Sequence, residues 1–333
     1  MKREPKSRLP MRNGAEMDFK ELRRFFETHD DYLILTHRNP DGDTVGCGFA
    51  LWNILHDMGK TAKVLNCEPF PKRYDFLYEG YIESSFEPKT IVAVDVADKQ
   101  LLGDTLMQYA DRVDLCIDHH ISNKHYAKET IVDGNASSAT LVLYRFMKEQ
   151  GIPMTDIIAK CIYTGLATDT GCFKFSNTIP EAHIAAAELM AYDIDFVNVN
   201  RRMFDIKSMG RIKVENIVIK DMEFYFGGRC TVICVTQAMI NDTGVDPAEF
   251  DGLASIPLEV EGAVIGITLK ELKDRSGFKL SVRTTEEADA SAFCRQFGGG
   301  GHIRAAGCEI KGTLAEVKAK VLAAAEVLFA DER

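Results

Sequence analysis

The sequence predicts an α/β fold: a parallel sheet with helices on both faces, followed by a smaller α+β domain. Two observations lead to this prediction. In the first half of the chain, short and nearly continuous apolar runs alternate with helix-like segments, as is typical of buried parallel strands. Beyond about residue 205 the apolar runs are separated by glycine-containing turns, as in antiparallel hairpins.

Strands and helices are expected in alternation through the first domain. The helical spacing of apolar residues predicts a helix over Phe19–Phe26. The predicted strands are Tyr32–Thr36, Thr61–Leu65, Thr90–Asp95 and Leu115–Asp118. The further predicted helices are Val45–Met58, Ala136–Gln150, Asp156–Thr168 and Glu181–Tyr192, the last with Pro180 near its start.

The second half of the chain has a strand-rich pattern. Its predicted strands are Lys213–Phe226, Cys230–Thr236, Ala263–Leu272 and Gly277–Thr284, and Thr313–Phe329 is predicted as a final helix. We therefore expect a polar tail over 1–17, a first domain over 18–195, a helical connector over 196–215 and a second domain over 216–333.

Composition limits the classes of protein. The 333 residues, 46% of them hydrophobic, suit two domains with full cores. The formal net charge of −10 argues against a broad basic surface for long duplex nucleic acid, but not against small nucleotides. Nine scattered cysteines without a CxxC pair, a polar start and no apolar run near 20 residues predict a cytoplasmic protein with reduced thiols and no membrane contact.

Carboxylates and imidazoles follow several of the predicted strands. The first strand leads to His37, Asp41 and Asp43, and the helix Asp156–Thr168 leads to Asp169. Asp95 and Asp118-His119-His120 end two further strands. Any one aspartate here would more often be a turn or helix cap, but parallel strands collect their carboxyl ends at one edge of the sheet. The joint pattern therefore predicts a metal site.

The expected metal ligands are two histidines and four aspartates. An oxygen-rich shell with some imidazole suits Mn²⁺ better than Mg²⁺, and the lack of thiolates argues against structural zinc. Six ligands are too many for one ion that keeps an open position. Two ions about 3.5–4 Å apart, sharing one carboxylate, fit the set better.

A glycine cluster occurs late in the chain. Gly298-Gly299-Gly300-Gly301 precedes His302, and such a run lets a ligand approach exposed backbone N–H groups. A helix after this loop would add its dipole. A glycine run alone is equally consistent with a flexible turn, but His302 favours ligand contact. Arg283, at the end of a predicted strand, could reach a phosphate or stack on a base.

The pattern of metal-binding residues resembles the motifs of the DHH phosphoesterase superfamily. The resemblance implies a centre of two Mn²⁺ ions, with Mg²⁺ or Co²⁺ as possible substitutes, that hydrolyses phosphate esters and anhydrides. It implies that one ion is held by His37 and Asp41, that Asp95 bridges, and that the other ion is held by Asp43, His119 and Asp169. Asp118 would orient a histidine ligand, and His120 would face the scissile phosphate.

The glycine cluster is similar to the DHHA1 domain, which binds the nucleotide or RNA part of the substrate in this superfamily. The resemblance implies substrate contacts from Arg283, Gly299, Gly300, Gly301 and His302. Asp118-His119-His120-Ile121-Ser122-Asn123 and Asp133-x-x-Ala136-Ser137-Ser138 are similar to the oligoribonuclease and pAp-phosphatase branch. Lys174 stands where many members have an arginine.

The expected reaction is hydrolysis by water activated between two ions, which would release mononucleotides from very short RNA or AMP and phosphate from 3′-phosphoadenosine 5′-phosphate (pAp). Several alternatives remain at this stage. They are a RecJ-like exonuclease, a manganese pyrophosphatase, a phosphodiesterase for cyclic or linear dinucleotides, and a nucleotide-binding module with a structural metal site. A homodimer is also possible.

Overall fold

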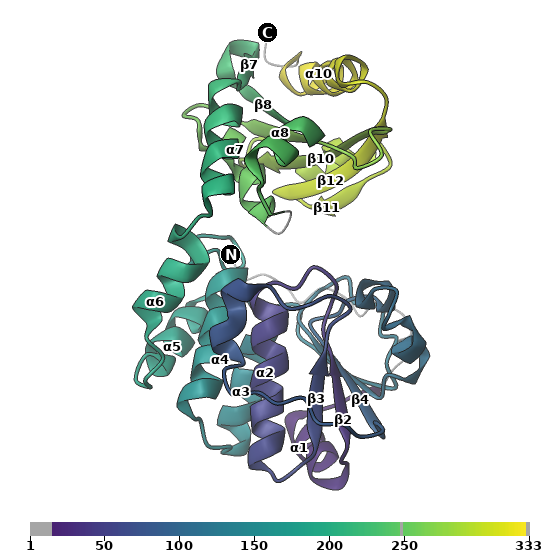
Figure 1. The fold of residues 1–333 in the computed structure, drawn as a ribbon, viewed down its shortest axis with the longest axis vertical. Coiled ribbons are helices and arrows are strands. Elements are labelled where there is room, and N and C mark those ends of the chain that lie inside the picture. Colours follow the sequence, from purple (N-terminus) through teal and green to yellow (C-terminus); the bar gives the residue numbers. More distant parts are fainter. Residues whose placement is uncertain (1–14, 247–248, 331–333) are drawn as a thin grey trace, which may run out of the picture. The chain divides into compact units, whose positions relative to one another are not determined.

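The computed structural model describes residues 15–246 and 249–330, which divide into two compact units between Ile206 and Lys207 (Figure 1). The division falls inside the range expected for the connector. That range contains α6 (Phe196–Asn200), the π-helical turn η4 (Arg201–Asp205) and the start of α7 (Met209–Lys220). Most of the expected tail lies outside the described residues, but Ala15–Glu16 form a short strand, β1.

The first unit contains the predicted parallel sheet. Its strand order is β1-β6-β5-β4-β2-β3, and every neighbouring pair is parallel. Sequence analysis missed β6. The bounds are β2 Tyr32–Leu35, β3 Ala62–Leu65, β4 Thr90–Val94, β5 Leu115–Asp118 and β6 Glu129–Val132.

The sheet is buried on both faces, as predicted, because side chains alternate between two cores. Ile34 and Val92 belong to a large core under the α-helices, whereas Leu33 and Ile91 belong to a smaller one. Figure 1 shows the α-helices gathered on one side of the strands. The smaller core is covered by two 3₁₀ helices, η2 (Lys99–Leu102) and η3 (Met107–Arg112). The α-helices are α1 Phe19–Thr28, α2 Gly42–Asp57, α3 Ala139–Gln150, α4 Asp156–Asp169 and α5 Pro180–Leu189.

Helices α2 and α4 approach each other through glycines. A Cβ added at Gly42 would lie 2.3 Å from Thr168 Oγ1, and one at Gly46 would lie 2.5 Å from the carbonyl oxygen of Cys161. Only glycine permits such an approach without a shift of the backbone. The start of α2 and the end of α4 consequently meet at one edge of the sheet, which brings Asp43 and Asp169 together.

The second unit is the expected smaller α+β domain. Its sheet has the order β11-β12-β10-β9-β8-β7 and is antiparallel except for the pair β8 and β9. The bounds are β7 Glu223–Tyr225, β8 Cys230–Val235, β9 Ile265–Glu271, β10 Gly277–Thr284, β11 Gly300–His302 and β12 Ala305–Lys311. The helices are α7, α8 (Gln237–Thr243), the 3₁₀ helix η7 (Asp251–Glu259), α9 (Ala290–Arg295) and α10 (Leu314–Ala330).

The prediction of a strand over Lys213–Phe226 is wrong for most of that range. The segment forms the end of α7, and only Glu223–Tyr225 are a strand. The β-branched residues suggested a strand, but Val214 and Val218 are four residues apart and both buried, which is helical spacing. Ser208 caps this helix by accepting a hydrogen bond from the Arg211 N–H at 3.0 Å.

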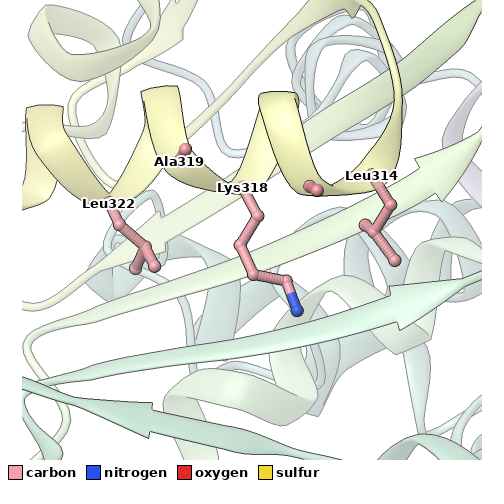
Figure 2. Close-up of a pocket in the computed structure, with 5 residues that line it drawn as sticks. Leu314, Lys318, Ala319 and Leu322 are labelled. Atoms are coloured by element: carbon pink, nitrogen blue, oxygen red, sulfur yellow. The ribbon is translucent and has the colours of Figure 1, made fainter.

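Helix α10 closes the second unit by packing Val317, Val321 and Ala325 into its core. Beside this packed face lies a hollow of about 510 Å³ lined by Leu314, Ala315, Lys318, Ala319 and Leu322 (Figure 2). Lys318 forms an ion pair with Glu223 on the edge strand β7. Among the described residues, no helix is both long and apolar enough to cross a lipid bilayer.

The close approach of α2 and α4 makes a testable prediction. Gly46→Ala should lower the free energy of unfolding by about 1–3 kcal/mol, because the added methyl group meets the backbone carbonyl of Cys161. Urea unfolding of the full chain would measure the change. His56→Ala, at an exposed position of the same helix, is the control and should change stability by less than about 0.5 kcal/mol. Equal stability of Gly46→Ala and the wild type would contradict the packing argument.

Candidate functional site

The parallel strands deliver polar side chains to one edge of the sheet. Asp118 is the last residue of β5, Asp95 directly follows β4, and His37 lies two residues after β2. Asp95 has a left-handed backbone (φ 57°), which aspartate tolerates better than most residues. Its N–H still donates to the Ile117 carbonyl at 2.8 Å, so β5 holds this turn in place.

Three triads of potential ligands form at this edge, with the ligand atoms of each triad all within 4.8 Å of one another. The residues that recur in them are Asp95 and His119. The triads are His37, Asp41 and Asp95; Asp43, His119 and Asp169; and Asp95, His119 and His120. All six residues expected from the sequence as metal ligands are therefore brought together.

Asp95 belongs to two of the triads and faces each of these two with a different oxygen. Its Oδ2 is 3.4 Å from His37 Nε2, whereas its Oδ1 is 3.6 Å from His119 Nε2 and 3.5 Å from His120 Nδ1. Asp95 Oδ1 and His119 Nε2 are buried and have no hydrogen-bond partner among the described residues. Buried polar atoms are normally satisfied, so these two mark a place where a cation fits.

Asp41 and Asp43 are held by helix starts. Asp41 caps α2, because its Oδ1 accepts hydrogen bonds from the N–H groups of Asp43 and Thr44, both at 3.0 Å. Asp43 reaches from α2 to the start of α3. Its Oδ2 accepts from the Ala139 N–H at 2.6 Å, and its Oδ1 accepts from the Thr140 N–H at 3.0 Å and the Thr140 hydroxyl at 2.7 Å. The positive end of α3 stabilises this buried carboxylate.

Asp169 ends α4 and is oriented by an asparagine. Its Oδ2 lies 3.6 Å from His119 Nε2. The Asn177 side-chain amide donates to Asp169 Oδ2 at 3.2 Å, to the Asp169 carbonyl at 3.1 Å and to the Ser137 carbonyl at 3.1 Å. Sequence analysis missed Asn177, because it lies in a turn with no strand end to mark it.

Backbone carbonyls orient the rings of His37 and His119. His37 Nδ1 is 2.8 Å from the Arg38 carbonyl, and His119 Nδ1 is 3.2 Å from the Ala136 carbonyl. A proton on each Nδ1 is inferred from these contacts, so Nε2 is the nitrogen of each ring that faces the carboxylates. Asn66, directly after β3, donates to the His37 carbonyl at 2.7 Å and was also missed, although its position after a strand could have indicated it.

Asp118 orients His120. Its Oδ1 lies 2.8 Å from His120 Nδ1 and accepts from the His119 N–H at 2.8 Å, while its Oδ2 accepts from the Asn123 amide at 2.5 Å. The ring that Asp118 contacts is therefore that of His120 and not that of the expected ligand His119. Burial acts to lower the pKa of His120, but the hydrogen bond that its Nδ1 donates to Asp118 outweighs burial and raises the pKa to about 9.

The site carries more negative charge than its own residues balance. Burial, with Asp43 nearby, raises the pKa of Asp95 to about 7, and burial likewise raises the pKa values of Asp43 and Asp169. Burial also acts to raise the pKa of Asp41, but the hydrogen bond to His37 outweighs it, leaving a pKa of about 2. A raised carboxylate pKa reflects an anion without enough positive charge around it, and a bound cation supplies that charge.

The donor set fits divalent cations of the manganese class, because it combines carboxylate oxygens with imidazole nitrogens and contains no thiolate. The carboxylate of Asp95 is shared by two of the triads. When bound, such ions lower the pKa of coordinated water and neutralise charge that develops on phosphoryl oxygens.

The glycine cluster lies in the second unit, in a hairpin. Gly300–His302 form strand β11, which pairs with the next strand, β12, in a hairpin. Among the described residues, a strand and not a helix therefore follows the glycine loop, so no helix dipole acts there. Two of these positions require glycine for structural reasons. A Cβ at Gly299 would lie 2.3 Å from Cys308 Cβ, and Gly301 has a φ of 144°, which side chains disfavour. Gly300 is exposed and faces open space.

Arg283 and His302 lie in one cross-strand row. Both pair in register with Ala305, Arg283 from β10 on one side and His302 from β11 on the other. Directly paired residues of an antiparallel sheet point to the same face. The exposed His302 and the half-buried Arg283 therefore share a face beside the exposed backbone of Gly300.

Comparisons with known proteins identify both units. Residues 31–166 match the DHH family, N-terminal domain, and residues 230–331 match the DHHA1 domain. The bifunctional oligoribonuclease and PAP phosphatase NrnA of Thermus thermophilus is 30% identical over 285 residues, covering 84% of each chain. The probable NrnA of Streptococcus mutans is 25% identical, covering 87% of this chain and 92% of that one.

A solved structure shares the fold. An exopolyphosphatase-related protein from Bacteroides fragilis has a TM-score of 0.81 and covers 94% of this chain and 95% of its own. At 23% sequence identity, the similarity to this protein concerns the fold alone.

The raised pKa of Asp95 makes Mn²⁺ binding depend on pH. Below about pH 7 the metal-free carboxyl is protonated, and an ion must displace that proton before it binds. We expect the Kd for Mn²⁺ to rise by about fivefold as the pH falls from 7 to 6, because the ionised fraction of a carboxyl with a pKa of about 7 falls by that factor. Calorimetry at pH 6, 7 and 8, in buffers of different ionisation enthalpy, would measure both affinity and proton release. An affinity unchanged over this range would contradict the pKa assignment.

The shared position of Asp95 predicts the metal stoichiometry of variants. The wild type should bind two Mn²⁺ ions and His37→Ala should bind one. Asp95→Ala should bind neither ion tightly, because it removes a carboxylate from each of the two triads that contain Asp95. Metal content after dialysis, measured by atomic emission, gives the count. His56→Ala, an exposed histidine outside the triads, should keep both ions. One retained ion in Asp95→Ala would show that the carboxylate serves a single site.

Proposed function

The chain belongs to the DHH/DHHA1 phosphoesterase family, and we propose that within this family it is a manganese-dependent hydrolase of very short oligoribonucleotides and of pAp. The products would be mononucleotides from the former, and AMP and phosphate from the latter. The observation that carries the proposal is the position of Asp95, whose two oxygens face His37 and His119. The relatives named oligoribonuclease and PAP phosphatase support the choice of substrates.

The proposal assigns a task to each part of the cluster. His37, Asp41 and Asp95 would hold one ion, and Asp43, Asp95, His119 and Asp169 the other. His120 is the residue we propose to meet the phosphate. Its Nδ1 is bonded to Asp118, so its Nε2 is the atom available to donate a hydrogen bond to a phosphate oxygen or a proton to the leaving oxygen. With its pKa raised to about 9, this ring carries the proton at neutral pH.

The second unit would recognise the nucleotide. Arg283 and His302 share a face of the sheet, and the exposed backbone of Gly300 and Gly301, next to the half-buried Gly299, allows a ribose or base to approach. Such a surface serves a substrate of a few nucleotides and needs no long basic track. The net charge of −10 agrees with a short substrate, because extended phosphate contacts would require clustered lysine and arginine. We further propose a cytoplasmic location.

A substrate panel tests the function directly. Purified protein with Mn²⁺ would be given pAp, a dinucleotide, a longer RNA, cyclic di-AMP and pyrophosphate at equal concentration. We expect kcat/KM to be highest for pAp or the dinucleotide. Highest activity on cyclic di-AMP would favour a cyclic-dinucleotide phosphodiesterase instead. Tight nucleotide binding with no turnover of any of these would favour a binding module with a structural metal site.

The division of tasks between the two units predicts a selective defect. His302→Ala should lower kcat/KM for the dinucleotide and pAp by about tenfold or more, but leave hydrolysis of a generic aryl phosphoester nearly unchanged, because that substrate has no base to recognise. Ile303→Ala, at the neighbouring exposed position, is the matched control and should behave like the wild type. Equal losses on nucleotide and aryl substrates would refute the division.

A further inference from the structure

A cavity in the first unit lies one strand away from the metal ligands. It has a volume of about 390 Å³ at the carboxyl end of β3, the edge strand of the parallel sheet. Strand β3 pairs with β2 in the register Leu65 to Leu35, so Asn66 on the cavity wall and Thr36 are neighbours at the strand spacing of about 4.8 Å. His37 is the next residue. The lining residues are Phe49, Val64, Leu65, Asn66, Cys67, Glu68, Pro69, Phe70, Tyr78, Tyr81 and Glu83.

Aromatic rings form a preformed wall of this cavity. Phe49 on α2 is 1% exposed, and the rings of Tyr78, Tyr81 and Phe70 pack against it with centroid distances of 5.0, 5.2 and 5.3 Å. The Tyr81 hydroxyl accepts a hydrogen bond from the Val64 N–H at 3.0 Å, which fixes that ring against the edge strand. The half-buried rings of Phe70, Tyr78 and Tyr81 are held in place by Phe49, so a planar base can stack on them without further ordering cost.

A hydrogen bond ties the cavity to the metal triads. The Asn66 side-chain amide donates to the His37 carbonyl and to the Thr36 hydroxyl, both at 2.7 Å. A group bound in the cavity therefore lies at the same sheet edge as the phosphate-hydrolysing cluster. This is the arrangement needed for the base of a nucleotide whose phosphate is at the metals.

The charged residues that line the cavity indicate which chemical groups it would bind. Its charged residues are the exposed carboxylates Glu68 and Glu83, and neither forms an ion pair within the described part of the chain. Two free carboxylates repel phosphate but accept hydrogen bonds from N–H groups. Guanine presents a ring N–H and an amino group on one edge, whereas adenine presents only an amino group there.

We propose that this cavity is a base-binding subsite that prefers guanine. This proposal rests on the proposed function, because the subsite would bind one base of a short oligoribonucleotide substrate. Aromatic stacking would supply affinity for any base, and Glu68 and Glu83 would supply the preference for guanine. Dinucleotides of guanosine would then be hydrolysed with a lower KM than those of adenosine.

The lone tryptophan of the chain reports on this cavity. Trp52 packs edge-on against Tyr81 with a centroid distance of 5.1 Å. A base stacking beside Tyr81 should therefore change the Trp52 emission. Guanosine, which lacks phosphate, is the probe, and it is titrated into the full chain in EDTA so that neither metal nor turnover contributes. We expect a saturable change in emission, with adenosine binding about tenfold more weakly.

Variants separate recognition from folding. The double variant Glu68→Gln/Glu83→Gln should raise the Kd for guanosine about tenfold, to the value for adenosine. Phe70→Leu should weaken the binding of both nucleosides. Glu79→Gln, an exposed carboxylate of the same segment outside the cavity, is the matched control and should leave both Kd values unchanged. No Trp52 response to guanosine, or an equal response to guanosine and adenosine in the wild type, would overturn the proposal.

Kinetics with Mn²⁺ distinguish failure of the subsite from failure of the proposed function. The double variant should raise KM for a guanosine dinucleotide about tenfold with kcat nearly unchanged, while an aryl phosphoester is cleaved as by the wild type. Hydrolysis of both dinucleotides with no change in KM in the variant would overturn the subsite alone. A wild type that binds guanosine selectively but cleaves no nucleotide would refute the proposed function and leave the subsite standing.

Discussion

The burial of Asp95 is the constraint on which the candidate site depends. This carboxylate is 2% exposed, follows a central strand, and has one oxygen directed at each of two histidines. A buried anion is costly without a counter-charge, and the raised pKa of Asp95 reflects that cost. The backbone nevertheless adopts a left-handed conformation to put the side chain there. Such a position is consistent with a site whose missing charge comes from bound cations.

The helices around Asp95 combine structural and functional tasks. Asp43 belongs to α2 but accepts hydrogen bonds from the first N–H groups of α3, so it joins two helices while facing His119. The glycine contacts between α2 and α4 set the separation of Asp43 and Asp169. A change in helix packing would therefore move ligands, and core stability and metal affinity are coupled in this unit.

The proposed function divides chemistry and recognition between the two units. The first unit holds every member of the three triads, and its hydrogen bonds orient each histidine ring before any ligand binds. The second unit contributes a sheet face with Arg283 and His302 and an exposed glycine backbone. In the proposed arrangement, base contacts decide which phosphoester is presented, and the first unit would cleave any that reaches its ions.

The sequence by itself determined the parallel sheet, the smaller α+β second domain and the six residues of the candidate metal site. Each of these follows from local information: apolar runs predict the strands, glycine-containing turns predict the hairpins, and histidine and aspartate at or after strand ends predict the site. Strand β6 and helix α7 were not recognised, because short apolar or β-branched runs do not separate strand from helix. Only the tertiary structure decided that Asp118 orients His120, that Asn177 and Asn66 hold Asp169 and His37, and that the last two glycines of the cluster belong to strand β11. These contacts join residues whose partners are chosen by packing in three dimensions, and no spacing along the chain encodes that choice.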